Sequence, residues 1–217
     1  MDALVNINGD RVPTLELLLM LTVISLLPSI LVMMTSFTRI VIILSFVRNA
    51  LGVQQVPPNM VMIGISLFLT LFIMDPVISE INTDAYEPYK QQEISQEEAL
   101  ERAQGPMKEF MLRQTELSSV NMYIDLSGTK EVEELTELPM TVIIPAFMTS
   151  ELKRAFMSGF LLFLPFLLID IVVSTTLMSM GMFMLPPATI SLPFKLLLFV
   201  TVDGWQLLFS TLVQSFR

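Results

Sequence analysis

The sequence predicts an all-α membrane protein of helical hairpins with kinked apolar helices. A small acidic helical domain is expected between its second and third apolar blocks. Of the 217 residues, 53% are apolar and only 15% are charged, with a mean hydropathy of +0.68. The apolar residues are gathered into long runs, and a helix needs about 20 of them to cross a bilayer.

The charge is concentrated in one segment. Residues 81–138 hold 13 acidic and 5 basic residues, a net charge of −8 out of −9 for the chain. Such a segment between apolar blocks is typical of a water-facing insert. The sequence therefore divides into N-terminal apolar hairpins (1–80), an acidic helical insert (81–138) and a C-terminal apolar hairpin (139–217).

The N-terminal part contains two runs of span length, at 15–34 and 60–78. Between them lies a shorter apolar stretch, 40–47, with Arg39 and Arg48 on its two sides. Its length is too small for it to span a bilayer alone.

Two further apolar blocks, 156–185 and 190–213, bring the total to four. An even number of blocks places both termini on the same side of the membrane as the insert. Arg39 and Arg48 favour a cytoplasmic first hairpin, because short cytoplasmic loops are enriched in basic residues. We therefore expect the insert to lie outside the cytoplasm.

The insert carries its own helix signals. Ser95 followed by Glu98 predicts a capping box at a helix N-terminus. We expect this helix to end near Gly105-Pro106 and a second helix to follow over 107–117.

The residue types present weigh against several classes of chemistry. The chain has no cysteine and no histidine. It therefore lacks disulfides, the commonest general base and the usual zinc and haem ligands. We expect no enzymatic activity, no metal and no cofactor. The acidic balance also argues against nucleic acid as a partner.

Charged residues stand out where they interrupt apolar sequence. Glu151, Lys153 and Arg154 lie just before the third block, where a position near the membrane interface would accommodate them equally well. Asp170 is different, because uncharged sequence extends for a dozen residues on both sides. A charge at a bilayer centre costs about 2.5–3.5 kcal/mol unless it is paired or meets water.

Asp170 is either a proton-relay carboxylate or one half of a buried ion pair. Pairing is favoured, because its own helix holds no other ionisable group, so its cation must come from another helix or another chain. Lys195 and Asp203 are about 12 Å apart along a helix and also need partners elsewhere. These three charges together favour an assembly of several chains.

Helix geometry is expected to be irregular in the third block. Pro165 predicts a kink or break, which neighbouring helices can tolerate by satisfying the freed carbonyl. Small residues such as Ser158 and Gly159 allow close contact between helices.

The run from Met178 to Pro187 contains four methionines at alternate positions and allows three interpretations. The first is a copper(I) site of thioethers, which the lack of histidine and cysteine disfavours. The second is ordinary filling of a buried helix, which Gly181 and Pro186-Pro187 disfavour. The third is a loop that several copies bring together as a ring of flexible, uncharged side chains.

Four segments of the sequence resemble the FliP family, the core export-gate subunits of the flagellar type III secretion system. They are FTRIVIILSFVRNALG (37–52), PAFMTSELKRAFMSGF (145–160), PFLLIDIVVS (165–174) and MGMFMLPPATISLPFKLLLFVTVDGWQLL (180–208). All four segments, 71 residues in total, lie outside the insert.

The resemblance implies that copies of the chain, five in that family, assemble with FliQ and FliR into a closed helical cone in the inner membrane of the flagellar basal body. Unfolded flagellar proteins pass through it, and other export-apparatus proteins such as FlhB adjoin it. The resemblance also implies that the apolar blocks form bent hairpins within the cone, and that the insert lies on the periplasmic side.

The resemblance further assigns roles to individual residues. Glu151 and Lys195 match an ion pair between subunits, and Asp170 matches an acid that meets a lysine of FliR. A methionine-rich gasket is assigned to Met180, Met182, Phe183 and Met184. Helix breaks are expected at Pro165, Pro186 and Pro187.

Overall fold

The computed structural model describes residues 4–7, 10–53, 55–128 and 134–216. In chain order the elements are β1 (Leu4–Ile7), β2 (Asp10–Pro13), α1 (Thr14–Met34), α2 (Phe37–Leu51), α3 (Asn59–Ile81), the π-helical η1 (Asn82–Tyr86), α4 (Glu87–Lys90), α5 (Gln96–Gln114), α6 (Leu117–Ser127), the 3₁₀ turn η2 (Leu135–Glu137), α7 (Met140–Ser179), α8 (Pro187–Thr201) and α9 (Gly204–Gln214). The predicted all-α class is confirmed. Its exception is the β1–β2 hairpin, in which Leu4 pairs with Pro13 and Ile7 with Asp10.

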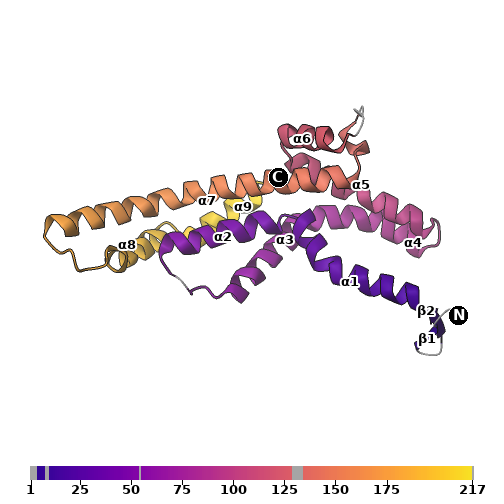
Figure 1. Cartoon of the computed structure of the whole chain (residues 1–217), viewed down its shortest axis with the longest axis horizontal. Coiled ribbons are helices and arrows are strands. Elements are labelled where there is room, and N and C mark those ends of the chain that lie inside the picture. Colours follow the sequence, from indigo (N-terminus) through magenta and orange to yellow (C-terminus); the bar gives the residue numbers. More distant parts are fainter. Residues whose placement is uncertain (1–3, 8–9, 54, 129–133, 217) are drawn as a thin grey trace.

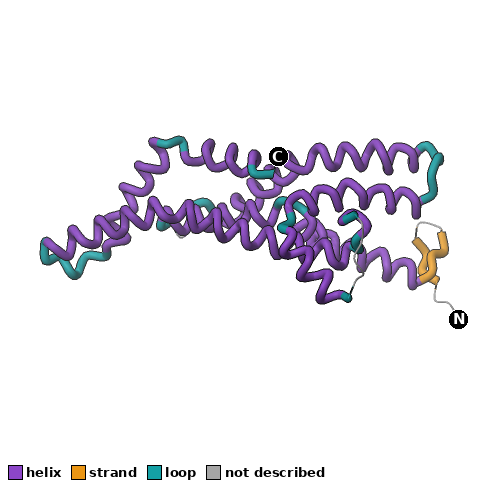
Figure 2. Tube along the Cα trace, turned by 90° about the horizontal axis from the view of Figure 1, so that it is seen from above, coloured by secondary structure: helices purple, strands orange, loops and turns teal. Residues whose placement is uncertain are grey.

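The molecule is elongated, as Figures 1 and 2 show, and α7 runs along most of its length. The loop from α7 to α8 lies at one end, and α4 and α5 lie toward the other. Helices α8 and α9 return along α7, so the C-terminus lies near the middle. With 40 residues, α7 is about 60 Å long, roughly twice the hydrocarbon thickness of a bilayer.

Helix α7 continues through the predicted break at Pro165. A break at Pro165 is therefore wrong, while a kink there stays a prediction. A proline removes one intrahelical hydrogen bond, and packing on both of its sides can offset the loss. The Phe166 ring is buried and lies 6.3 Å from the Phe199 ring of α8, while Leu162 packs against the core on the other side.

The insert differs from its prediction in a similar way. Ser95 caps α5 as expected, since its side chain accepts a hydrogen bond from the Glu98 backbone N–H at 3.2 Å. The helix does not end at Gly105-Pro106, however, but continues to Gln114. The side chains of Pro106, Phe110 and Met111 are buried, and this packing outweighs the local cost of glycine and proline.

Buried residues of the insert belong to the same core as the apolar helices. Met111 of α5 and Val120 of α6 lie in one cluster with Ile40 and Leu44 of α2 and Phe147 of α7, all at most 1% exposed. The insert is therefore fastened to the N-terminal half of α7 and does not form a separate core.

Close contact between α2 and α7 depends on a small residue. A Cβ built on Gly159 would lie 2.5 Å from the Phe46 ring, closer than any real contact. The expectation that Gly159 permits close helix packing is confirmed.

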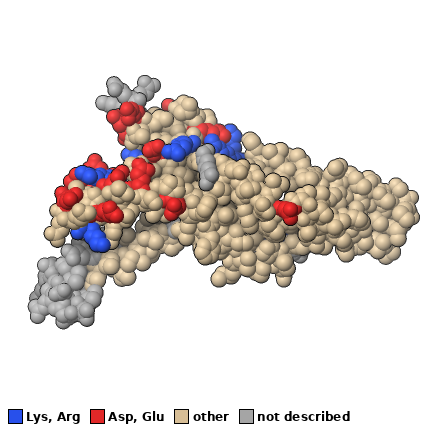
Figure 3. Space-filling view, turned by 180° about the vertical axis from the view of Figure 1, so that it is seen from behind, with Lys and Arg blue, Asp and Glu red and all other residues tan. Residues whose placement is uncertain are grey.

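Two described helices are long and apolar enough to cross a membrane. One is Asn59–Lys90 and the other is Met140–Ser179; α8 and α9 add a third if this pair, bent by 61°, counts as one span. Within α1, only the shorter Met20–Ile30 qualifies as an apolar helix. The charged side chains gather over the insert end of the visible face in Figure 3, and the opposite end is nearly free of them.

Candidate functional site

The most deeply buried polar contact joins α2 to α7. The Arg39 guanidinium donates to both carboxylate oxygens of Glu151, from Nε to Oε2 at 2.8 Å and from Nη2 to Oε1. Their side chains are 4% and 0% exposed. Because the Glu151 side chain is fully enclosed by protein, it does not extend to the membrane interface, which the sequence had left open.

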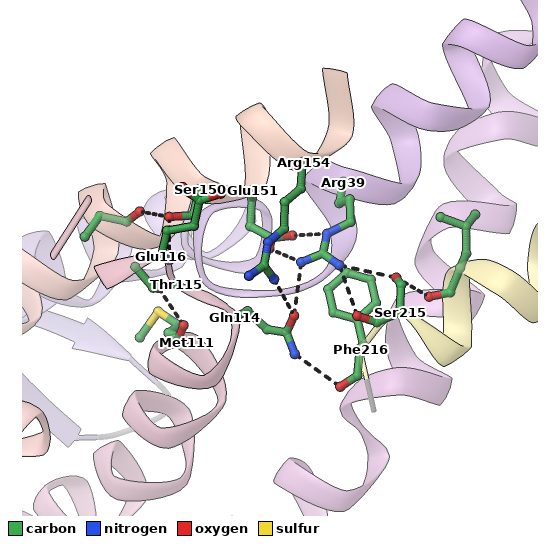
Figure 4. A network of polar contacts seen from close by, with 12 residues as sticks. Arg39, Met111, Gln114, Thr115, Glu116, Ser150, Glu151, Arg154, Ser215 and Phe216 are labelled. Atoms are coloured by element: carbon green, nitrogen blue, oxygen red, sulfur yellow. Dashed lines mark hydrogen bonds and ion pairs between the residues drawn. The ribbon is translucent and has the colours of Figure 1, made fainter. Parts of the chain in front are cut away.

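Arg39 has a partner for each of its remaining N–H groups, as Figure 4 shows. Nη2 donates to Gln114 Oε1 at 3.1 Å, and Nη1 donates to the backbone oxygen and the Oγ of Ser215, both at 3.3 Å. The guanidinium also lies 3.8 Å from the centre of the Phe216 ring. All five N–H donors of the Arg39 guanidinium therefore have an acceptor, which is the full hydrogen-bonding capacity of an arginine side chain.

Gln114 ties the insert to this cluster. Its Oε1 also accepts a hydrogen bond from Arg154 Nη1 at 3.1 Å, and its Nε2 donates to the Phe216 backbone oxygen at 3.2 Å. Arg39 and Gln114 together therefore hold four parts of the chain: α2, α5, α7 and the C-terminal residues. We call the set formed by Arg39, Gln114, Glu151, Ser215 and Phe216 the arginine cluster.

The sequence interpretation missed the role of Arg39, which entered only as a marker of membrane orientation. A usable signal was present, because Arg39 lies in an apolar segment and Glu151 lies beside another. Sequence alone could not pair them, since 112 positions separate the two residues.

A second contact between Glu116 and Lys153 lies at the surface. Lys153 Nζ is 2.6 Å from Glu116 Oε2. The hydrogen bond from Lys153 lowers the pKa of the Glu116 carboxyl below its ordinary value of 4.5. The Glu116 backbone N–H also donates to Ser150 Oγ at 3.0 Å, so this residue docks the α5–α6 turn onto α7.

The Asp170 carboxylate is paired within the chain. Lys195 Nζ donates to Asp170 Oδ2 and Ser191 Oγ donates to Oδ1, both at 2.6 Å. Ser191 and Lys195 lie four positions apart on α8, so both reach the same point on α7. This contact closes the α7–α8 hairpin and provides the cation that the sequence required of another helix.

Another helix of the same chain, one of the two sources that the sequence allowed, thus provides the cation for Asp170, and Lys195 is paired there as well. Spacing along one helix could not choose between the two sources, because the choice depends on the hairpin that brings α8 back along α7. Glu151 binds Arg39, so the pairs between subunits that the resemblance implied stay predictions. Two charges of the C-terminal segment have no ion-pair partner among the described residues, Arg154 and Asp203.

The methionine run leaves the helix at Gly181. Its backbone has φ +77°, which favours glycine. The Gly181 N–H donates to the Met178 oxygen at 3.1 Å, and the Met182 N–H donates to the Leu177 oxygen at 3.0 Å. These two bonds form a Schellman motif, the common termination of an α-helix by a left-handed glycine.

The loop that follows projects from the tip of the hairpin. Met184 is 98% exposed, Phe183 77% and Met180 68%, while Met182 is less exposed. Pro186 precedes α8 and Pro187 is its first residue, the helix position at which the missing N–H costs least. The interpretation of the run as filler of a continuous buried helix is therefore wrong, because its second half is an exposed loop.

An apolar groove lies along the middle of α7. It has a volume of about 830 Å³ and is bordered by α2, the part of α7 from Arg154 to Phe166, the bend between α8 and α9, and α9. The described residues contain no group of three or more Asp, Glu, His or Cys side chains placed to hold a metal ion.

This arrangement of apolar helices, with ion pairs closing its hairpins, defines a helical membrane protein. The chain belongs to the FliP family, whose profile matches residues 20–212. This confirms the family that the sequence resembled.

Individual relatives agree with the family match. The chain is similar to the flagellar biosynthetic protein FliP of Pectobacterium carotovorum subsp. carotovorum, with 53% identity over 211 residues that cover 96% of this chain and 82% of the relative. It is 51% identical to the protein of that name from Bacillus subtilis (strain 168), with both chains fully covered. The Aquifex aeolicus protein is 49% identical over 97% of this chain and 89% of its own.

Proposed function

We propose that several copies of this chain, five by the family resemblance, assemble with FliQ and FliR into the closed helical channel of the flagellar export gate. As a FliP-family chain it is a membrane-embedded subunit of the flagellar export apparatus. Unfolded flagellar proteins would pass through the channel unchanged, so the subunit acts as a structural component and not as an enzyme. FlhB and other export-apparatus membrane proteins would adjoin it.

The methionine loop carries this proposal. Gly181 directs the loop away from α7, and Met180, Met182, Phe183 and Met184 all lie outside regular helix. None of the four side chains is charged, and each thioether can change rotamer at low cost. Several copies around an axis would form a ring that excludes ions yet deforms around a polypeptide.

The dimensions of α7 support a shared structure. A helix of about 60 Å exceeds the hydrocarbon layer by roughly 30 Å. The middle of α7 carries exposed apolar side chains, among them Phe160, Leu161 and Leu168, which are each more than half exposed. Neighbouring subunits would cover this surface, so that the hairpins stand inside a cone instead of crossing the bilayer singly.

The gate would lie in the bacterial inner membrane, with the insert on the periplasmic side. The concentration of charge at one end in Figure 3 supports a water-facing insert. In the assembled gate, Asp170 and Lys195 could exchange partners with FliR and with Glu151 of the next copy, as the resemblance implies. Such an exchange would have to open the contacts that these residues make in the single chain.

Conductance tests the proposal. The complex is purified with FliQ and FliR, its mass gives the number of copies, and its ion leak is recorded in a planar bilayer. The triple variant M180A/M182A/M184A should leak ions while its mass stays unchanged. The matched control is M122A, which shortens an exposed methionine of α6 outside the loop.

Two outcomes would contradict the proposal. An unchanged leak in the triple variant would exclude the loop as the seal, and a purified chain that never forms a multimer would exclude the channel. Copper(I) taken up at sub-stoichiometric metal, and lost in the triple variant, would instead favour a metal site.

A further inference from the structure

The apolar groove along the middle of α7 has Arg154 in its wall and Asp203 between two of its lining residues, and neither charge has an ion-pair partner among the described residues. Its walls are mostly apolar, from Leu161 and Phe166 of α7, Phe199 of α8 and Leu207 and Leu208 of α9. Arg154 lines it on α7, and Val202 and Gly204, the two neighbours of Asp203, line it at the α8–α9 bend.

Most N–H donors of the Arg154 guanidinium have no described acceptor. Its one described contact is the hydrogen bond from Nη1 to Gln114 Oε1. Glu151 and Glu116 are close enough to attract its charge, but Glu151 binds Arg39 and Glu116 binds Lys153. A guanidinium that keeps most of its five donors free beside an apolar wall favours a carboxylate partner.

Asp203 is the complementary group. Its backbone is left-handed, with φ +51°, a conformation that aspartate adopts more readily than most residues with a side chain. Although it precedes α9, its side chain makes no capping hydrogen bond. The backbone conformation therefore accounts for an aspartate at this bend, but the carboxylate has no partner among the described residues.

The bend itself is held firmly in place. A Cβ on Gly204 would lie 2.4 Å from the Phe199 ring, and that ring packs edge-on against Trp205 at 5.1 Å. Val200 and Val202 beside Asp203 are at least half exposed. The bend thus presents a carboxylate flanked by apolar side chains, on a rigid support.

We propose that the α8–α9 bend of one copy docks into the Arg154 end of this groove on the next copy, and that Asp203 pairs there with Arg154. The proposal rests on the proposed assembly of copies and names one of its contacts. The groove accepts a carboxylate flanked by apolar residues, and the bend provides this chemistry. Because the two patches differ, the contact is head-to-tail and can repeat around a ring.

Cross-linking tests the contact directly, because the chain has no cysteine of its own. Copies carrying R154C and copies carrying D203C are co-expressed with FliQ and FliR, and the complex is treated with a short bismaleimide. A covalent dimer should form only when both kinds of copy are present. The control pair is K153C with D203C, since Lys153 is adjacent in sequence but turned toward Glu116.

Charge reversal provides a second measurement. R154D and D203R should each lower the yield of complex several-fold, and the double variant R154D/D203R should restore it. Restoration would also show that the single variants are not simply misfolded. Reversed charges that never rescue one another would overturn the proposed pair.

Other outcomes separate this inference from the proposed function. A multimer of normal mass without the specific cross-link overturns the contact and leaves the channel standing. The absence of any multimer in the unaltered chain overturns both. If R154D forms a normal complex but loses co-purified anionic phospholipid, the groove binds lipid and the proposed pair is wrong.

Discussion

Arg39 and Glu151 form a two-point ion pair that is almost completely enclosed and that joins residues 112 positions apart. The pair lies where α2 crosses α7, and Gln114 extends it to the insert and to the C-terminal residues. One buried cation therefore fixes the relative positions of segments that the sequence treats as three separate parts.

Removing the Glu151 carboxylate should strongly destabilise the chain. Glu151→Ala leaves the Arg39 charge buried without its anion, and we expect a loss of about 3–5 kcal/mol in the free energy of unfolding. Denaturant unfolding in detergent can be followed by the fluorescence of Trp205, the only tryptophan of the chain.

The matched control for Glu151 is Glu109→Ala, which breaks an exposed pair with Arg113. Exposed pairs four positions apart on a helix contribute about 0.3–0.5 kcal/mol. Equal losses in the two variants would show that the arginine cluster does not hold the helices together.

The Asp170–Lys195 contact should stabilise the α7–α8 hairpin in the single chain, before any partner binds. The side chains are 30% and 6% exposed. We therefore expect Asp170→Ala to cost toward the lower end of about 3–5 kcal/mol. The exchanged pair D170K/K195D should recover part of this stability, as judged by the same unfolding measurement.

Asp203→Asn is the control for Asp170, since it neutralises a carboxylate without a described partner. It should change the unfolding of the isolated chain by no more than about 0.5 kcal/mol. If D170A unfolds like the unaltered chain but assembles poorly with FliR, the Asp170 carboxylate acts between subunits. Its pairing with Lys195 would then contribute little to the stability of the single chain.

Gly181 should control the course of the methionine loop. Alanine there costs about 1–2 kcal/mol, because the Schellman motif requires a left-handed residue. We expect Gly181→Ala to shift the loop and raise the ion leak of the assembled gate, even though every methionine is retained. Gly105→Ala, in the middle of α5 where a Cβ meets nothing within 4 Å, should leave the leak unchanged.

Acidification should loosen the α5–α6 turn, where the Glu116 carboxylate binds Lys153. The pKa of Glu116 is lowered by its hydrogen bond with Lys153. Its contribution to stability is therefore fully present above pH 4.5 and is lost as the pH falls through the lowered pKa. The protection of the amides around residues 115–120 from hydrogen exchange, relative to the intrinsic rate at each pH, should fall over that range.

Glu116→Gln should remove this pH dependence, so that protection around 115–120, relative to the intrinsic rate at each pH, stays constant. An identical acid-induced loss of protection in E116Q would show that another group is responsible.

The sequence by itself determined the helical membrane class, the acidic insert, the cap at Ser95 and the family. These follow from local composition and from strings of residues that are specific without knowledge of contacts. It also indicated that Asp170 needs a cation and that Gly181 interrupts a helix, because the cost of a buried charge and the freedom of glycine are local properties.

Only the tertiary structure decided which charges meet. Asp170 binds Lys195, and Glu151 binds Arg39, because hairpins bring distant segments together at points that spacing along one helix cannot give. Packing also decided that α5 and α7 continue through Pro106 and Pro165, where neighbouring side chains outweigh the local preference to stop. Burial against other helices, summed over many contacts, exceeds the few kcal/mol that a single proline costs.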